Sequence, residues 1–175
     1  VWGADIEINE SKKYYPAFIC SIMQTILELG IKGNYSGVSA IVVPSLCDSL
    51  KTLGQNWKYA VKDIPFIPMT YPQNRKPDYA VDFTVEMYKR VINDLENITG
   101  EKFDESKLKK TYEIYNEHNR VMREFSKISE DYEVSAADRS AVFKSAWFML
   151  KEEHTELVKE LIELIKKEGK ISKKL

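Results

Sequence analysis

The run SAIVVPS, residues 39–45, constrains the fold of this chain more than any other segment. It is short, rich in β-branched side chains, and apolar at odd and even positions alike. That pattern is typical of a strand that is buried on both faces. Strands of this kind belong to parallel sheets covered by helices, so the segment predicts a parallel sheet.

A helical pattern precedes this strand. In residues 14–29 the apolar side chains recur at helical spacing, with Pro16 suited to a first turn and Gly30 to a C-terminal stop. Cys20 would then lie about one turn into the helix, among apolar neighbours. The pattern predicts an amphipathic helix.

A second helix and a second strand follow. Ser45 and Asp48 have the form of a capping box, which predicts a helix from about residue 46 to residue 62 with Cys47 in its first turn. The pattern of residues 64–72 indicates a strand that its prolines confine to an edge or shorten. This β-α-β-α alternation favours a layered α/β core.

Beyond Pro77 the pattern is helical, over residues 78–98, 105–129, 136–152 and 154–168. Asp104 is placed as an N-cap, and Ser135 with Asp138 forms another capping box. The predicted fold class is α/β: a small parallel sheet flanked by helices, Rossmann- or flavodoxin-like and incomplete, followed by a helical region. Because the chain starts without Met, we expect a fragment. Residues 1–77 would be a partial α/β domain lacking its first strand, and residues 78–175 would lead to an absent second α/β domain.

Charge and composition exclude several classes of partner. The 26 basic and 27 acidic residues leave a net charge of −1, which gives no reason to expect nucleic acid or anionic lipid. No window approaches the roughly 18 apolar residues of a membrane span. The two cysteines are too few for a disulfide-dependent fold of this size. We therefore expect a cytoplasmic protein without a membrane partner.

Cys47 follows the predicted strand at a strand-loop-helix junction, where α/β folds place ligands. The positive end of the next helix favours a thiolate, which is the form that binds metal. The alternative is a small buried residue, because free cysteines are commonly buried, and the same applies to Cys20. Their spacing matches no compact zinc or ferredoxin motif, so spacing alone leaves both interpretations open.

Other polar groups are weaker candidates for a binding site. Backbone amides near Ser45, Asp48 and Ser49 would surround the Cys47 sulfur. A second polar junction holds Gln73, Asn74 and Arg75, which are placed to reach a ligand or a partner, or else form a plain turn. His118 and His154 have charged neighbours and are expected at the surface.

Three segments together resemble the 2-hydroxyacyl-CoA dehydratase family, which includes benzoyl-CoA reductase subunits. They are VWGADIEINESKKYYPAFICSIMQTILELG, AIVVPSLCDSLKTLGQNWK and IPFIPMTYPQNRKPDYAVDFTVEMYKRVINDLENITG. The pairing of YYPAFIC with PSLCDSL is the most specific part. The PMTYPQNR stretch with the following helix looks like the second, beta or D-component type of subunit.

The resemblance implies a function. Enzymes of this family are heterodimers whose subunits each hold a four-iron four-sulfur (4Fe-4S) cluster through three cysteines, and an ATP-dependent activator with its own iron-sulfur cluster supplies the electron. Cys20 and Cys47 match the first two ligands, and the third would lie outside the fragment. This subunit would relay the electron, while acyl-CoA binds mainly to the partner subunit. The lyase reaction converts an (R)-2-hydroxyacyl-CoA into a 2-enoyl-CoA through a ketyl radical, as in anaerobic amino-acid fermentation.

Three further interpretations stay open: a benzoyl-CoA reductase-like subunit, a noncatalytic assembly protein of the same fold, and an independent thiol-based redox protein in which Cys20 and Cys47 approach within disulfide range. For the isolated fragment we expect no cluster and no activity. We also expect an apolar helix face left partly exposed where the absent domain would pack, with Leu157, Leu161, Leu164 and Ile165 as candidates. The sequence does not identify the acyl group.

Overall fold

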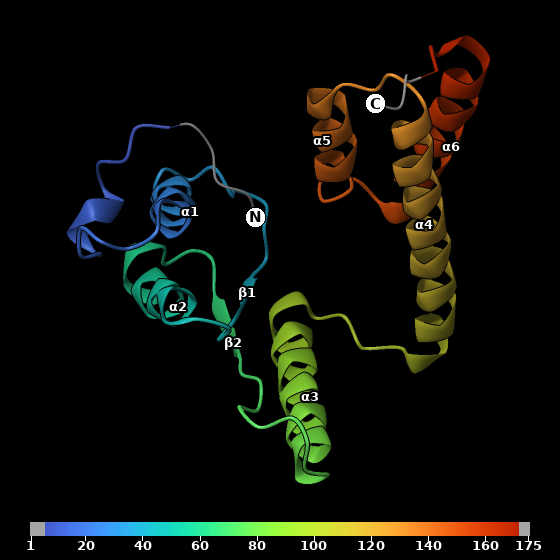
Figure 1. Cartoon of the computed structure of the whole chain (residues 1–175). Helices are drawn as coiled ribbons and strands as arrows, with labels where there is room; N and C mark the ends of the chain where they lie inside the picture. Colours follow the sequence, from blue (N-terminus) through green and yellow to red (C-terminus); the bar gives the residue numbers. More distant parts are fainter. Residues whose placement is uncertain (1–5, 172–175) are drawn as a thin grey trace. The chain divides into compact units, whose positions relative to one another are not determined.

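The computed structural model describes residues 6–171. They form two compact units, one that ends at Phe103 and one that begins at Asp104. Figure 1 labels the elements of both. The first unit contains a short 3-10 helix η1 (Ser11–Lys13), then α1 (Ser21–Ile31), β1 (Ile41–Pro44), α2 (Asp48–Ala60), β2 (Phe66–Met69) and α3 (Tyr79–Thr99). The second contains α4 (Glu105–Asp131), α5 (Ala136–Ser145) and α6 (Lys151–Glu168).

The sheet of the first unit has two parallel strands within the described residues. Ile41 lies opposite Phe66, and Pro44 lies opposite Met69. In Figure 1 the strands lie between the α1–α2 pair and α3, and α2 and α3 both contact the sheet. The predicted fold class is confirmed: a small parallel sheet flanked by helices, followed by a helical region.

Alternate residues of β2 face two different cores. The strand predicted within residues 39–45 is not buried on both faces, because Val42 of β1 is 40% exposed. On one face, Ile41, Val43 and Phe66 belong with the buried side chains of α1 and α2, among which Leu27 and Trp57 are fully buried. On the other face, three buried residues, Ile67, Met69 and Val91, join β2 to α3. The period-2 alternation of strand side chains thus lets one short sheet hold helices on both sides.

Two glycines set how closely the layers approach. A Cβ atom on Gly30 would lie 2.7 Å from the ring of Trp57, and one on Gly54 would lie 2.4 Å from the ring of Phe66. Both distances are too short for a side chain. Glycine at these positions therefore lets α1 pack directly on α2, and α2 directly on β2.

Helix α1 begins later than predicted. The chain from Pro16 makes a separate turn, closed by a hydrogen bond from the Ile19 N–H to the Pro16 carbonyl (3.1 Å). Cys20 is then extended, with ψ 141°, and the helix starts at Ser21. Phe18, expected on the apolar helix face, is 88% exposed. The separate turn from Pro16 to Ile19 and the extended Cys20 interrupt the helical hydrogen bonds, so α1 begins only at Ser21.

The second unit is built on the packing of α4 against α6. Its core joins Val121, Met122 and Phe125 of α4 to Val158 and Ile162 of α6. Of the four residues expected to form an exposed apolar face, two pack partly against this core, Leu161 and Ile165, whereas Leu157 and Leu164 are about half exposed.

Helix boundaries in this unit follow the capping residues. The Asp104 carboxylate accepts a hydrogen bond from the Ser106 N–H, and the Ser135 hydroxyl oxygen accepts one from the Asp138 N–H. Both N-caps were predicted. The helix predicted for residues 136–152 ends at Ser145, because the chain turns before α6.

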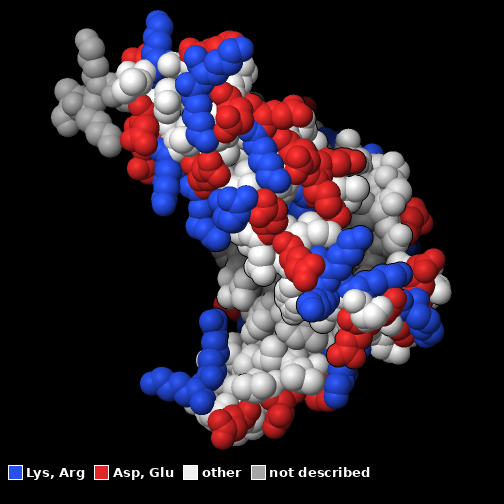
Figure 2. Space-filling view, turned by 90° about the vertical axis from the view of Figure 1, so that its right-hand side faces the viewer, with Lys and Arg blue, Asp and Glu red and all other residues white. Residues whose placement is uncertain are grey.

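Charges of both signs are intermixed on the face shown in Figure 2, where Lys and Arg side chains lie beside Asp and Glu. Many form ion pairs, as Lys166 does with Glu124 at 3.2 Å. Among residues 6–171 no helix has the combination of length and apolar character that a membrane crossing needs.

Candidate functional site

The loops that follow β1 and β2 leave the same edge of the sheet, because the two strands are parallel. The first loop spans residues 45–47 and leads into α2, and the second spans residues 70–78 and leads into α3. The Ser45 N–H still donates to the Met69 carbonyl (2.8 Å), so the two loops start out side by side.

Cys47 is the N-cap of α2 and is exposed. Its sulfur accepts a hydrogen bond from the Leu50 N–H at 3.4 Å. This corrects two details of the prediction: Cys47 precedes the first turn instead of lying in it, and the cap is Cys47 instead of Ser45. Ser45 is unavailable as a cap because its backbone is held by the sheet.

Cys20 takes the same position on α1. It is the N-cap of that helix, with no side-chain hydrogen bond to the helix, and it is exposed. The prediction that it lies one turn inside the helix among apolar side chains is wrong. The alternative of two buried core thiols fails as well, since both sulfurs are accessible at the start of neighbouring helices.

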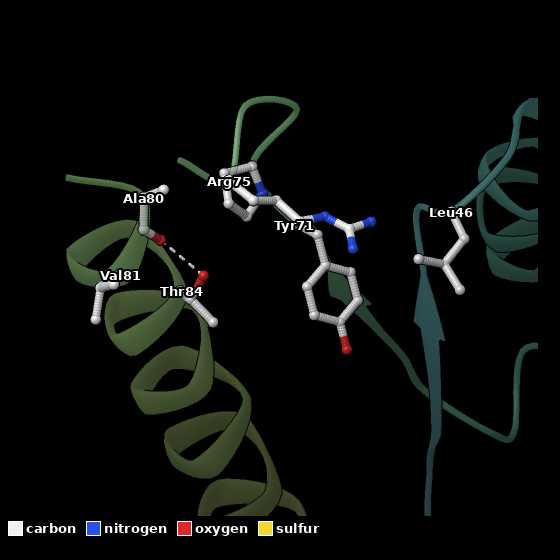
Figure 3. A pocket seen from close by; sticks show the side chains of 7 residues that line it. Leu46, Tyr71, Arg75, Ala80, Val81 and Thr84 are labelled. Atoms are coloured by element: carbon white, nitrogen blue, oxygen red, sulfur yellow. Dashed lines mark hydrogen bonds between the residues drawn. The ribbon is translucent and has the colours of Figure 1, made fainter. Parts of the chain in front are cut away.

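An open cavity of about 420 Å³ lies at the same edge of the sheet. Figure 3 shows Leu46, the neighbour of Cys47, on one side and the start of α3 on the other, with the Arg75 side chain extending between them. Its lining is Leu46, Tyr71, Pro72, Arg75, Ala80, Val81 and Thr84. A single guanidinium in a mostly apolar lining is suited to an anionic group.

The other predicted site residues divide between the two loops. Asp48 is exposed and pairs with Lys51 at 3.3 Å, and Ser49 is half-buried in the first turn of α2. Gln73 and Asn74 are exposed and lie outside the cavity lining. The Asn74 side chain accepts from the Lys76 N–H (3.2 Å), which is the bond of a local turn.

A buried carboxylate in the first unit was missed by the sequence analysis. Glu28 is fully buried on α1 and accepts a hydrogen bond from the Ser11 N–H at 2.7 Å, while Lys32 pairs with it at 3.0 Å. Burial raises the pKa of Glu28, but hydrogen bonds from the backbone of residues 9–11 and from Lys32 outweigh it and lower that pKa to about 2. Glu28 thereby holds the segment before Cys20 against α1.

Tyr15 was also missed. Its side chain is 8% exposed within the α1–α2 core, and its hydroxyl has no hydrogen-bond partner in the described part of the chain. Burial raises the pKa of Tyr15, and the charge of a Cys20 thiolate raises it further. The hydroxyl is therefore a protonated donor near Cys20.

The histidines contradict the surface prediction. His118 and His154 are buried in the second unit, with 3.0 Å between His118 Nε2 and His154 Nδ1. His154 Nε2 lies 3.0 Å from the Ser145 hydroxyl and 3.1 Å from the Val142 carbonyl. Since that hydroxyl also lies within bonding distance of the Val142 carbonyl, a consistent assignment has His154 Nε2–H donating and Nδ1 accepting from His118. Burial lowers the pKa of both rings, with Lys151 adding to the effect.

The two thiols fit an iron-sulfur group as a partial donor set. Thiolate is the usual ligand of such clusters, and a backbone N–H to sulfur bond like that at Cys47 accompanies it in the surrounding shell. Within residues 6–171 no three or more His, Cys, Asp and Glu side chains gather as a complete metal site. Two exposed thiols therefore match part of a ligand set.

Comparison with known proteins agrees with the resemblance in the sequence. The chain is 45% identical over 168 residues to the (R)-phenyllactyl-CoA dehydratase beta subunit of Clostridium sporogenes. The matched region covers 95% of this chain and 45% of that protein. It is 35% identical over 165 residues to the (R)-2-hydroxyglutaryl-CoA dehydratase beta subunit of Acidaminococcus fermentans, and the matched region covers 92% of this chain and 44% of that protein. A benzoyl-CoA reductase subunit of Thauera aromatica is 23% identical over 162 residues, covering 91% and 42%.

The chain thus spans less than half the length of these curated relatives. The family model described as 2-hydroxyglutaryl-CoA dehydratase, D-component, matches residues 2–174. A match over nearly the whole sequence establishes that the chain belongs to the 2-hydroxyglutaryl-CoA dehydratase D-component family.

Proposed function

We propose that this chain is part of the electron-relaying subunit of a heterodimeric (R)-2-hydroxyacyl-CoA dehydratase, with Cys20 and Cys47 as two of the three ligands of a 4Fe-4S cluster. The observation that carries the proposal is the shared position of the thiols. Each one caps a helix, each is exposed, and the two helices pack on one another. Buried structural cysteines would have no reason to occupy matching exposed positions.

The chain supplies binding and surroundings for the cluster. The two thiolates would hold iron, and the Leu50 N–H would keep its bond to the Cys47 sulfur. The positive ends of α1 and α2 favour negative charge at both sulfurs. When bound, the cluster would supply one-electron redox chemistry. The third ligand is proposed to come from outside these 175 residues, which contain two cysteines.

The cavity beside Leu46 belongs to the same proposal. Arg75 extends into it from the β2–α3 loop, close to the residue that precedes Cys47. A guanidinium there would stabilise negative charge, so Arg75 is proposed to tune the site together with the backbone amides of residues 45–49. Gln73 and Asn74 lie outside the cavity lining and are therefore weaker candidates for tuning the cluster site.

The whole protein would act with partners. The proposed reaction removes water from an (R)-2-hydroxyacyl-CoA to give a 2-enoyl-CoA through a substrate ketyl radical, with the acyl-CoA mainly on a homologous partner subunit and the electron from an ATP-dependent activator. The higher identity to the dehydratase beta subunits favours this reaction over ring reduction by a benzoyl-CoA reductase-like enzyme. By itself the 175-residue chain is expected to be inactive and without a cluster.

The test is anaerobic iron and sulfide analysis with EPR on the full-length protein, co-expressed with its partner subunit. Cys20→Ala and Cys47→Ala should each lose the cluster of this subunit while the partner subunit keeps its own. Lys51→Ala, which changes an exposed side chain in the first turn of α2, is the matched control and should keep both clusters. Unchanged iron and an unchanged EPR signal in the cysteine variants would refute the proposal and favour a noncatalytic role.

A further inference from the structure

The hydroxyl of Tyr15 is an anomaly in the first unit. A buried hydroxyl without a hydrogen bond costs about 1–3 kcal/mol, so proteins seldom leave one unpaired. Tyr15 is 8% exposed, yet its hydroxyl has no partner among the described residues. Phenylalanine would fill the same space without that cost, so the hydroxyl needs another explanation.

The surroundings of Tyr15 place it with the start of α1. Tyr15 and Met23 belong to the same buried cluster, and the Met23 N–H donates to the carbonyl of Cys20 (3.1 Å). The chain between Tyr15 and Cys20 is a single turn, closed by the bond from Ile19 to Pro16. The ring is thus fixed in the core at the end of α1 where Cys20 lies, and Cys20 is close enough for its charge to act on the hydroxyl.

The segment that carries Tyr15 is held from two sides. The Asn56 side-chain amide of α2 donates to the Tyr14 carbonyl at 2.7 Å. Glu28 of α1 accepts from the Ser11 N–H at 2.7 Å. Each contact ties the segment that leads into Tyr15 to a helix whose N-cap is a cysteine. An anchored backbone keeps the ring in place, so the hydroxyl is preorganised as a donor.

We propose that Tyr15 is a positioning residue whose hydroxyl donates a hydrogen bond to a sulfide of the cluster at its Cys20 end, a partner that the chain alone does not supply. The inference rests on the proposed function, because it needs a cluster at Cys20. A hydrogen bond to sulfur stabilises the extra negative charge of the reduced cluster, and so raises the reduction potential.

Tyr35 provides a matched control. Its hydroxyl is also buried and unpartnered in the described part of the chain, and its ring lies 6.0 Å from the Trp57 ring in the same core. Burial raises the pKa of Tyr35, as it does for Tyr15, but Cys20 contributes only at Tyr15. A Tyr-to-Phe change therefore removes an equivalent hydroxyl at each position, and only one of them is near Cys20.

The experiment compares Tyr15→Phe, Tyr35→Phe and wild type as full-length protein with the partner subunit, loaded anaerobically. In an EPR-monitored redox titration, Tyr15→Phe should keep its iron and have a reduced-to-oxidised ratio about tenfold lower at a fixed potential. A tenfold change in that ratio corresponds to a reduction potential lower by about 59 mV for a one-electron couple. Tyr35→Phe should titrate like wild type. Site-specific 3-fluorotyrosine at position 15, a stronger donor, should move the potential in the opposite direction.

Electron-nuclear double resonance in D2O gives an independent readout. Wild type and Tyr35→Phe should show an exchangeable deuteron coupled to the cluster that Tyr15→Phe lacks. In the cluster-free protein the alkylation rate of Cys20 should be equal in wild type and Tyr15→Phe, because the hydroxyl has no partner in the chain alone. A faster rate in wild type would mean that the hydroxyl bonds to the Cys20 thiolate and would overturn the assignment to sulfide. Equal potentials and equal deuteron signals in all proteins would overturn the inference. A wild type without iron would overturn the proposed function itself.

Discussion

The two units treat buried polar groups in opposite ways. In the second unit, His118, His154 and Ser145 meet one another and the Val142 carbonyl, so the buried polar atoms satisfy each other. In the described part of the chain, the buried hydroxyls without a hydrogen-bond partner all lie in the first unit, and they belong to Ser11, Tyr15 and Tyr35. Satisfied polar groups stabilise a fold, whereas a buried hydroxyl without a partner costs free energy, and of the two tyrosines only Tyr15 lies near an accessible thiol.

Replacing Glu28 should produce the largest difference in stability between the two units. Glu28→Ala would leave the buried Ser11 N–H, and the neighbouring backbone donors, without an acceptor, and each such loss costs about 1–3 kcal/mol. We expect the first unit to lose about 3 kcal/mol of its free energy of unfolding while the second unit is unchanged. In a Trp147→Phe background the fluorescence of Trp57, which is buried in the first unit, follows urea unfolding and measures this loss.

Glu28→Gln is the control, because it keeps an acceptor oxygen and should cost less. The pH dependence has a definite sign. Since the pKa of Glu28 is lowered to about 2 in the folded chain, its contribution is present above the ordinary carboxyl pKa of about 4.5 and is lost as the pH falls towards 2. Equal stability of Glu28→Ala and wild type at pH 7 would contradict the role given to Glu28.

The histidine pair should make the second unit sensitive to mild acid. The pKa values of His118 and His154 are lowered in the folded chain, so folding favours the neutral rings. Stability is therefore full above the unfolded pKa of about 6.5 and falls as the pH drops below it. Thermal unfolding followed by circular dichroism should show a lower midpoint at pH 5 than at pH 8.

The double variant His118→Leu/His154→Leu should lose most of that pH dependence in the second unit. The single variant His154→Ala leaves His118 without its partner and should cost about 2 kcal/mol at pH 8. If the two rings were exposed to solvent, the stability of wild type and of the double variant would depend on pH in the same way. That result would contradict the burial of the pair.

The smallest effect is expected at the surface ion pairs between α4 and α6. Lys166 pairs with Glu124 at 3.2 Å and with Glu163 at 3.0 Å, but all three side chains are exposed. Exposed pairs contribute little because water and salt screen them. Lys166→Ala should leave the unfolding midpoint within experimental error, and a large shift would mean that charge holds the second unit together as much as its core does.

The sequence predicted element types better than element ends. The strand within residues 39–45 and the long helices were predicted correctly as elements, but the predicted burial of that strand on both faces is wrong, because Val42 is 40% exposed. The start of α1 was wrong because the apolar spacing continues through Phe18 and Ile19, while the backbone around Pro16 turns away from the helix. Local backbone geometry overrode the side-chain pattern there.

The candidate site was predicted in part. Cys20 and Cys47 were chosen from the family resemblance, and the structure adds that both cap helices. His118 and His154 were misplaced because charged neighbours in sequence hide a buried position on a long helix, and the bond between the rings joins residues 36 positions apart. Tyr15 and Glu28 gave no local signal, since their burial depends on how segments distant in sequence pack.

The capping positions of Cys20 and Cys47 bear on the order of events during biogenesis. Zinc fingers and similar small domains fold only when metal arrives, because metal binding supplies their folding energy. Here each thiol is carried by a helix whose core contacts, around Leu27 and Trp57, consist of the polypeptide alone. If Cys20 and Cys47 hold the proposed cluster, its insertion would therefore be a late maturation step on an already folded scaffold, and a cluster lost to oxygen should be replaceable without refolding.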